Sequence, residues 1–278
     1  MIIAVIGKGG VGKTTVTALL LRRLLDAGET PVLAVDADPS NCLGPALGLT
    51  ITRTLAELRD DLREGDTRSE SPGVRKSEGR SGGRPPSMAK SDWLALEAED
   101  AIVEQAGFDL LTMGHSEGPG CYCFVNNLIR SHLDRLARNY RHVLVDCEAG
   151  LEHLSRRTSG RPDRLVCVAN GSRMSRETIR RALELYQGLN GTLPRVDLVV
   201  NGRVGQVGPF DSLALAQGRQ AEGAGMFSSV IHVPWDQAIA DLDAAGKSLL
   251  QIDAASPALT AISSWNLPST STPASPPR

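Results

Sequence analysis

The sequence has few aromatic residues, no long apolar run and almost no net charge. Aromatic side chains make up 4% of the 278 residues, so aliphatic side chains must fill the core, and a hydrophobic share of 41% is enough for one. The formal net charge of −2 does not indicate a dedicated nucleic-acid binder. No apolar stretch approaches the roughly 20 residues that a membrane-spanning helix needs.

The sequence also lacks the marks of a secreted protein. It opens with MIIAVIGKGG, which has neither the charged region nor the long apolar run of a signal peptide. We therefore expect a cytoplasmic protein that binds neither membrane nor nucleic acid. In that compartment the five cysteines are expected to be thiols or metal ligands and not disulfides.

Short apolar runs alternate with helical patterns along the chain. The runs typical of buried strands are Ile2–Ile6, Val32–Val35, Phe108–Met113, His142–Asp146, Arg164–Ala169 and Val196–Val200. The stretches with helical spacing are Thr14–Ala27, Asp92–Gln105, Phe124–Asn139 and Met174–Leu189. This alternation predicts an α/β fold, with a doubly wound, mostly parallel sheet flanked by helices and ligands bound at the carboxyl ends of the strands.

Two segments depart from this pattern. Residues 64–90 are rich in Gly, Ser, Arg, Pro and Glu, and residues 266–278 are rich in Pro, Ser and Thr. Both compositions are typical of disorder. We predict a single nucleotide-binding domain over residues 1–265 that carries a disordered insertion at 64–90 and is followed by a disordered tail.

A glycine-rich motif follows the first predicted strand. The letters GKGGVGKT, from Gly7 to Thr14, fit the phosphate-loop pattern G-x-x-x-x-G-K-S/T. Its backbone N–H groups are expected to surround the phosphates of ATP, with Lys13 at the β- and γ-phosphates and Thr14 on Mg²⁺. The expected nucleotide contacts are Gly7, Gly9, Gly10, Val11, Gly12, Lys13, Thr14 and Thr15. The alternative is a simple glycine turn between a strand and a helix.

Acidic residues follow two of the predicted strands. Asp36 and Asp38 come after the second strand, and Asp146 comes at the end of a later one. A carboxylate at the end of a buried strand is costly unless it meets a metal or a donor. We expect Asp146 to act on the Mg²⁺ side through water and Asp36 to hold a Mg²⁺-bound water. The alternative for each acid is an ordinary helix N-cap.

The letters GKGGVGKTT, with Lys8 after the first glycine, resemble the deviant phosphate loop of the ParA/MinD/nitrogenase-iron-protein class of ATPases. The resemblance implies that Lys8 crosses a dimer interface to the partner's nucleotide, and that Asp38, before Pro39, polarises the attacking water. It also implies that Asn201 and the segment containing Pro234 hold the adenine. A solvent-facing lysine and a plain strand exit are the alternatives for Lys8 and for the base site.

A C-x-C pair, Cys121 and Cys123, lies in a glycine-rich stretch. On an extended segment the two side chains point to one side, close enough to share a soft or borderline metal. Two sulfurs make half of a closed site, and a two-fold dimer would supply four. The alternative is a pair of reduced thiols without a metal.

At this point the resemblance becomes narrower, to CooC-type ATPases that help to insert nickel into carbon monoxide dehydrogenase. It rests on Gly7–Thr15 with Val35–Pro39, on Gly107–Gly114 running into Glu117–Cys123, and on Asp146–Arg157. It implies an ATP-hydrolysing homodimer formed on ATP or metal binding, with Ni²⁺ or Zn²⁺ held by Cys121 and Cys123 at the dimer interface. The implied client is a carbon monoxide dehydrogenase-like metalloenzyme.

Three rival functions remain open at this stage. A positioning or partition ATPase would bind membrane through an amphipathic C-terminal helix or DNA through basic patches, and the C-terminal residues here have a single arginine. An electron-transfer ATPase would hold an iron–sulfur cluster between subunits. A biosynthetic ligase would need a small-molecule pocket that the sequence does not reveal.

Overall fold

The computed structural model describes residues 1–58, 89, 92, 96, 98–114, 136–148, 161–202 and 227–265. These residues form one eight-stranded sheet in the order β3-β4-β2-β5-β1-β6-β7-β8. Every neighbouring pair is parallel except the pair β3–β4. The strands are β1 (Ile2–Gly7), β2 (Val32–Ala37), β3 (Ile102–Gln105), β4 (Phe108–Thr112), β5 (His142–Cys147), β6 (Arg164–Ala169), β7 (Arg195–Gly202) and β8 (Ser229–Pro234). The predicted fold class is confirmed.

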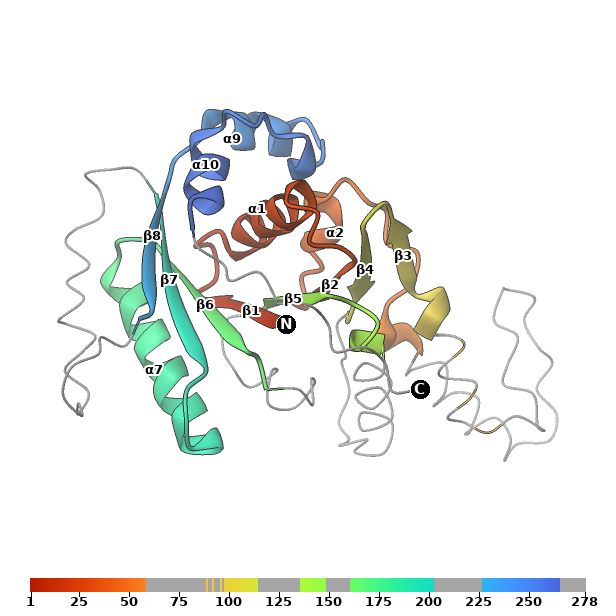
Figure 1. Cartoon of the computed structure of the whole chain (residues 1–278), viewed down its shortest axis with the longest axis horizontal. Coiled ribbons are helices and arrows are strands. Elements are labelled where there is room, and N and C mark those ends of the chain that lie inside the picture. The colour runs from red at the N-terminus through yellow and green to blue at the C-terminus, as the bar shows by residue number, and fades with distance from the viewer. Residues whose placement is uncertain are drawn as a thin grey trace.

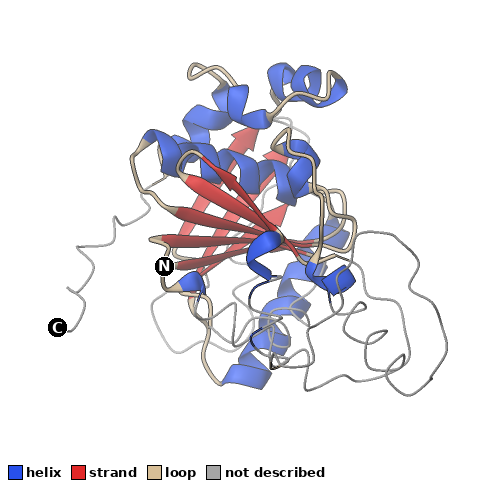
Figure 2. Ribbon diagram, turned by 90° about the vertical axis from the view of Figure 1, so that its right-hand side faces the viewer, coloured by secondary structure: helices blue, strands red, loops and turns tan. Residues whose placement is uncertain are grey.

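Helices cover both faces of the sheet (Figures 1 and 2). The helices are α1 (Lys13–Asp26), α2 (Leu43–Ala46), α7 (Arg173–Asn190), α9 (Gln237–Ala244), the short 3-10 helix η1 (Leu249–Gln251) and α10 (Pro257–Ser263). The helix α7 packs on one face, and α1 lies with α9 and α10 on the other. The sheet is therefore the middle layer of three.

Side chains alternate between these two faces along each strand. In β5, Val143 and Val145 join the core on the α7 face, whereas Leu144 joins the core on the α1 face. Because both faces are covered, the strands are nearly continuous apolar runs, which is why the sequence showed them clearly. The same alternation puts His142 and Asp146 on the α1 face, at opposite ends of the strand.

The prediction of a helix over Asp92–Gln105 is wrong at its C-terminal end. Residues Ile102–Gln105 form β3, which pairs antiparallel with β4 across a two-residue turn. Gly107 in that turn has φ of +86°, a conformation that glycine adopts without a steric penalty. The turn and the ladder with β4 outweigh the helical spacing of the apolar residues. The strand β8 at the far edge was not among the predicted strands.

Other predictions concern residues that lie mostly outside the described part of the chain. Most of the predicted helix Phe124–Asn139, the insertion at 64–90 apart from Ala89, and the tail at 266–278 lie outside the described residues. No helix in the described part of the chain combines the length and the apolar character needed to cross a membrane.

Removing the side chain of Leu20 should destabilise the fold because it is fully buried in the core between α1 and the sheet. We expect Leu20→Ala to lower the free energy of unfolding by about 2–5 kcal/mol, measured by denaturant titration. The matched control is Leu189→Ala in α7, where the side chain is 60% exposed, and the expected change is within about 0.5 kcal/mol. Equal losses for both variants would contradict the packing of α1 on the sheet.

Candidate nucleotide-binding site

The phosphate loop between β1 and α1 packs against the ends of β6 and β7. A Cβ atom added to Gly7 would lie 2.3 Å from the carbonyl oxygen of Val168, and one added to Gly12 would lie 2.2 Å from Nδ2 of Asn201. Gly12, which precedes α1, has φ of +92° and adopts the left-handed conformation. Gly7, whose φ is +155°, therefore requires glycine for space against a backbone atom and for conformation. Gly12 requires it mainly for conformation, because the end of the Asn201 side chain could move aside.

The crest of the same loop is open. Lys8, Gly9 and Gly10 are exposed, and a Cβ atom added to either glycine would meet nothing within 4 Å. Val11, by contrast, is buried and anchors the loop in the core of the α1 face. The crest is thus open at Gly9 and Gly10, and the loop leads into the N-terminus of α1, where backbone N–H groups favour an anion. A triphosphate fits this arrangement.

The first turns of α1 meet the end of β5. Oγ1 of Thr14 donates a hydrogen bond of 2.7 Å to Oδ2 of Asp146. Oγ1 of Thr17, one turn further on, lies 3.0 Å from the carbonyl oxygen of Lys13 and 3.3 Å from Oδ1 of Asp146. Lys13 itself is only 6% exposed. The predicted phosphate and Mg²⁺ residues Lys13, Thr14 and Asp146 are therefore brought together.

Two buried carboxylates lie side by side at this edge of the sheet. Asp36 of β2 and Asp146 of β5 are register partners, and neither side chain is exposed. Burial raises the pKa of Asp146 to about 7 and that of Asp36 to about 6. A buried carboxylate pair with raised pKa values is stabilised by a cation. With the hydroxyl of Thr14, the pair matches the oxygen ligands that Mg²⁺ prefers, directly or through water.

Asp36 also organises the loop between β2 and α2. Its Oδ1 accepts a hydrogen bond of 3.2 Å from the backbone N–H of Asp38, and its Oδ2 accepts one of 2.8 Å from that of Leu43. Oδ1 of Asp38 in turn accepts a hydrogen bond from the backbone N–H of Ser40. Leu43 is the first residue of α2, so Asp36 accepts a hydrogen bond from the N-terminus of that helix. The helix-capping alternative for Asp36 is therefore correct in part.

The two residues predicted to hold adenine end neighbouring strands. Asn201 and Gly202 of β7 are register partners of Val233 and Pro234 of β8. Nδ2 of Asn201 donates a hydrogen bond of 2.9 Å to the carbonyl oxygen of Val11 in the phosphate loop. Asn201 is therefore tied to the phosphate loop, and the predicted contacts of both residues with adenine remain predictions.

Two contacts of the site were missed by sequence reasoning. Thr17 approaches Asp146, and its position four residues after Lys13 on one helix was the available signal. The bond between Asn201 and Val11 joins residues that are 190 positions apart, for which a single sequence offers no signal. The first contact fixes the start of α1 and the second fixes the phosphate loop, both from the side of the sheet.

The predicted metal-binding pair Cys121 and Cys123 lies outside the described residues. In the part of the chain that the structure describes, no three His, Cys, Asp or Glu side chains are grouped so as to hold a metal ion. The Mg²⁺ site predicted here would draw on a hydroxyl, phosphate oxygens and water besides its carboxylates. The predicted Mg²⁺ site therefore does not need three His, Cys, Asp or Glu side chains.

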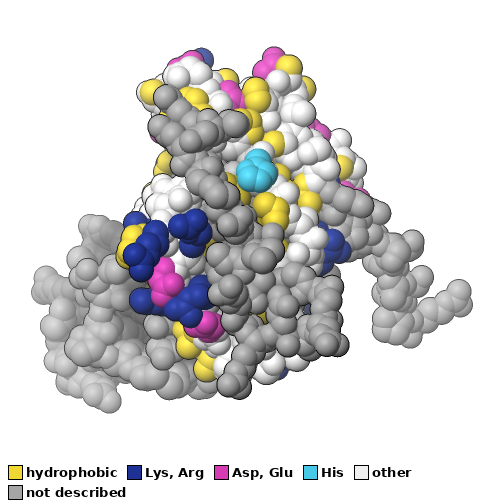
Figure 3. Space-filling model, turned by 90° about the vertical axis from the view of Figure 1, so that its left-hand side faces the viewer, with side chains coloured by type: hydrophobic (Ala, Val, Ile, Leu, Met, Phe, Trp, Pro, Cys, Tyr) yellow, Lys and Arg dark blue, Asp and Glu magenta, His cyan; other side chains and the backbone are white. Residues whose placement is uncertain are grey.

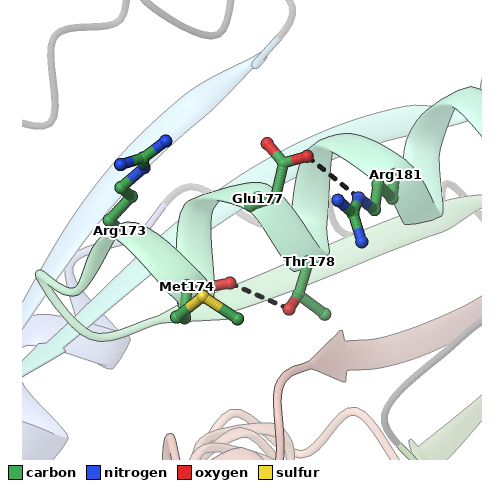
Figure 4. Close-up of a pocket in the computed structure, with 5 residues that line it drawn as sticks. All are labelled: Arg173, Met174, Glu177, Thr178 and Arg181. Carbon is green, nitrogen blue, oxygen red and sulfur yellow. Dashed lines mark hydrogen bonds and ion pairs between the residues drawn. The ribbon is translucent and has the colours of Figure 1, made fainter.

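A separate hollow lies on α7 (Figure 4). Its lining residues are Arg173, Met174, Glu177, Thr178 and Arg181. Part of the charge of this helix is neutralised within it, since Glu177 forms ion pairs with Arg180 at 2.6 Å and with Arg181 at 2.9 Å. Figure 3 shows the corresponding face, on which basic and acidic side chains lie together. This hollow includes no residue of the phosphate loop.

The loop, its lysine and threonine, and the two strand-end carboxylates define a P-loop nucleoside triphosphatase. Residues 2–250 match the family of CobQ/CobB/MinD/ParA nucleotide-binding domains. The chain belongs to this family of ATP-binding proteins and is an ATPase.

Two relatives are similar in sequence. An uncharacterized ATP-binding protein of Methanocaldococcus jannaschii is 39% identical over 201 residues, which are 72% of this chain and 74% of that protein. The carbon monoxide dehydrogenase accessory protein CooC of Rhodospirillum rubrum is 33% identical over 258 residues, which are 92% of this chain and 91% of that protein.

Solved structures support the fold. A ParA family ATPase from Chlorobium tepidum matches with a TM-score of 0.64 and 19% identity, over 95% of this chain and 96% of that one. The cell division ATPase MinD of Pyrococcus furiosus matches with a TM-score of 0.62 and 21% identity, over 94% of each chain. At such identities the likeness is one of fold alone.

The raised pKa of Asp146 predicts how the stability of the nucleotide-free protein depends on pH. A carboxyl group whose pKa is higher in the folded state stabilises the fold when protonated, and this contribution is lost as the pH rises through about 7. We expect the melting temperature of the wild type minus that of Asp146→Asn to fall between pH 5.5 and pH 8. A difference that rises over this range would contradict the raised pKa.

Proposed function

We propose that this ATPase is a dimeric switch that couples ATP hydrolysis to the insertion of nickel into a carbon monoxide dehydrogenase-type metalloenzyme. One observation carries the proposal: the 33% identity with a carbon monoxide dehydrogenase accessory protein extends over 92% of the chain. A likeness of that length involves far more than the phosphate loop, which many ATPases share. The C-x-C pair lies within the chain as a ligand set for the cargo metal.

Each residue of the site has a role in the proposed cycle. The loop amides and Lys13 bind the triphosphate, while Thr14, Asp36 and Asp146 hold Mg²⁺ directly or through water. When bound, Mg²⁺ would neutralise phosphate charge. Asp38 orients the attacking water from the loop after β2. Its side chain is partly exposed, so a water molecule has access to it.

Lys8 is the residue through which a second subunit would contribute. It lies exposed on the open crest of the loop, whereas Lys13 is buried beneath it. In a face-to-face dimer, Lys8 of one subunit would approach the phosphates held by the other. Positive charge supplied in this way stabilises the transition state of phosphoryl transfer.

The segment after β2 is the part of the chain that we expect to move when the bound nucleotide changes. Asp36 holds this segment through Leu43 and Asp38, and the same carboxylate is a register partner of Asp146. Loss of the γ-phosphate would change the charge that these carboxylates meet, and with it the position of the segment. Cys147 and Glu148 directly follow Asp146 in the chain. We expect them to move with Asp146 when the γ-phosphate is lost.

The adenine is proposed to bind beside the ends of β7 and β8. Asn201 and Pro234 lie at this edge, and the amide of Asn201 already contacts the phosphate loop. An asparagine side chain can both donate to and accept from the edge of a base.

Replacing Lys8 with alanine should separate ATP binding from dimer formation. We expect Lys8→Ala to bind ATP as the wild type does, to lose the ATP-dependent dimer and to hydrolyse ATP on the order of 10³-fold more slowly, because the charge supplied in trans is gone. Sedimentation velocity with a non-hydrolysable ATP analogue and turnover assays measure the two effects. The matched control is Lys247→Ala, at an exposed lysine between α9 and η1. A Lys8→Ala protein with normal turnover would contradict the role in trans.

Replacing both cysteines of the C-x-C pair should remove the cargo metal. We expect Cys121→Ser/Cys123→Ser to bind no Ni²⁺ or Zn²⁺ at the dimer interface and to retain ATP binding, measured by metal analysis of the dimer with and without ATP. The matched control is Cys42→Ser, at an exposed cysteine.

Other results of the same experiment would exclude the nickel function. An unchanged metal content in the double variant would remove the cysteines from the site. Iron and colour in anaerobically purified wild-type protein would favour an iron–sulfur ATPase. ATP-dependent co-sedimentation with DNA or lipid vesicles would favour a positioning ATPase.

A further inference from the structure

The helix α1 carries a second threonine in contact with Asp146. Thr17 lies one turn after Lys13, and its side chain has no exposed surface. Its helical neighbours Val16 and Ala18 are buried apolar members of the core on the α1 face. A hydroxyl group buried in such surroundings costs about 1–3 kcal/mol unless it forms hydrogen bonds, so its partners decide whether the position tolerates threonine.

The hydroxyl of Thr17 has two acceptors within reach. Its Oγ1 lies 3.0 Å from the carbonyl oxygen of Lys13 and 3.3 Å from Oδ1 of Asp146. The bond to the carbonyl oxygen four residues back is one that threonine forms in many helices, and it alone would satisfy the donor. The contact with Asp146 joins α1 to β5 and links residues whose |i−j| is 129. It therefore comes from the packing of the helix on the sheet and not from the helix itself.

Both oxygens of the Asp146 carboxyl group are held from α1. Oδ2 accepts the hydrogen bond of 2.7 Å from Thr14, and Oδ1 is approached by Thr17. These are the hydrogen bonds that the described residues offer this carboxyl group, whose side chain is fully buried. Rotation about the Cβ–Cγ bond of an aspartate has broad minima, so a single contact leaves the plane of the carboxyl group free to turn. Two contacts, one on each oxygen, fix this plane relative to the helix that begins with Lys13.

We propose that Thr17 is a positioning residue for ATP hydrolysis, which orients Asp146 towards Thr14 and the Mg²⁺ site. This role rests on the Mg²⁺ site proposed above and does not depend on the nickel function. Because the side chain of Thr17 is closed to solvent, it acts through Asp146 and not by contact with nucleotide or metal. A carboxylate is a stronger acceptor than a carbonyl oxygen, so the hydroxyl contributes more to Asp146 than to Lys13.

Nucleotide affinity with and without Mg²⁺, measured by calorimetry on the full chain, tests this role. Thr17→Val keeps the shape of the side chain and removes the hydroxyl, whereas Thr17→Ser keeps the hydroxyl and removes a methyl group. In EDTA, where the loop amides and Lys13 act alone, we expect both variants to bind a non-hydrolysable ATP analogue as the wild type does. The gain in affinity on addition of Mg²⁺ should be about tenfold smaller for Thr17→Val, because one charge-assisted hydrogen bond is lost, and unchanged for Thr17→Ser.

ATP turnover gives a second readout. For Thr17→Val, the Mg²⁺ concentration that gives half-maximal turnover should rise about tenfold, and Thr17→Ser should keep the wild-type value. The matched control is Thr178→Val on α7, because the hydroxyl of Thr178 donates to the carbonyl oxygen of Met174, four residues back, at 2.9 Å. This control removes the same local bond without touching Asp146, so it should leave both readouts unchanged.

Three results would overturn the role of Thr17. They are a full gain from Mg²⁺ in Thr17→Val, a loss of affinity that is equal with and without Mg²⁺, and a Thr17→Ser variant as impaired as Thr17→Val. Thr17→Ala takes the place of Thr17→Val if thermal unfolding shows that the latter does not fold. Asp146→Asn separates the two proposals. If this variant keeps the full gain, the Mg²⁺ site is wrong and the role of Thr17 falls with it. A gain that is lost in Asp146→Asn and kept in Thr17→Val refutes the role of Thr17 alone.

Discussion

The parallel pairing of β5 between β1 and β2 holds the nucleotide site together. It brings Asp146 beside Val5 on one side and beside Asp36 on the other. Because β1 runs directly into the phosphate loop, Thr14 at the start of α1 reaches Asp146 across 132 positions of sequence. If β5 were shifted by one residue, Asp146 would point to the α7 face and the contact would be lost.

The sequence predicted what depends on local patterns. The buried strands were visible as apolar runs, and the loop from Gly7 to Thr14 carries its chemistry in its spacing. The hairpin of β3 and β4 was missed because the apolar residues of Asp92–Gln105 are spaced as in a helix. The turn at Gly107 and the pairing with β4 make Ile102–Gln105 a strand instead. The bond from Asn201 to Val11 was missed because strand order, which no local pattern encodes, brings the two together.

Burial of charge has opposite consequences at the two ends of the α1 face. At the carboxyl edge, Asp36 and Asp146 are buried without an ion-pair partner in the described chain, and their pKa values rise accordingly. At the amino edge, by contrast, Arg164 is buried and paired with Asp197. The helix α1 connects the two clusters, since Lys13 and Arg23 both belong to it. The carboxyl edge therefore suits a cation with a phosphate chain, whereas the buried charge at the amino edge is balanced within the chain.

The phosphate loop is fixed on the side of its own subunit and open on the other. Val11 is buried, Gly7 and Gly12 touch the ends of β6 and β7, and Asn201 ties the backbone down. The exposed crest at Lys8 has no comparable support. A loop held rigidly from below loses little further entropy when phosphates bind, whereas a free lysine above them gains most from an acceptor presented by another molecule. This asymmetry is the physical reason to expect that a second subunit completes the site over the phosphates.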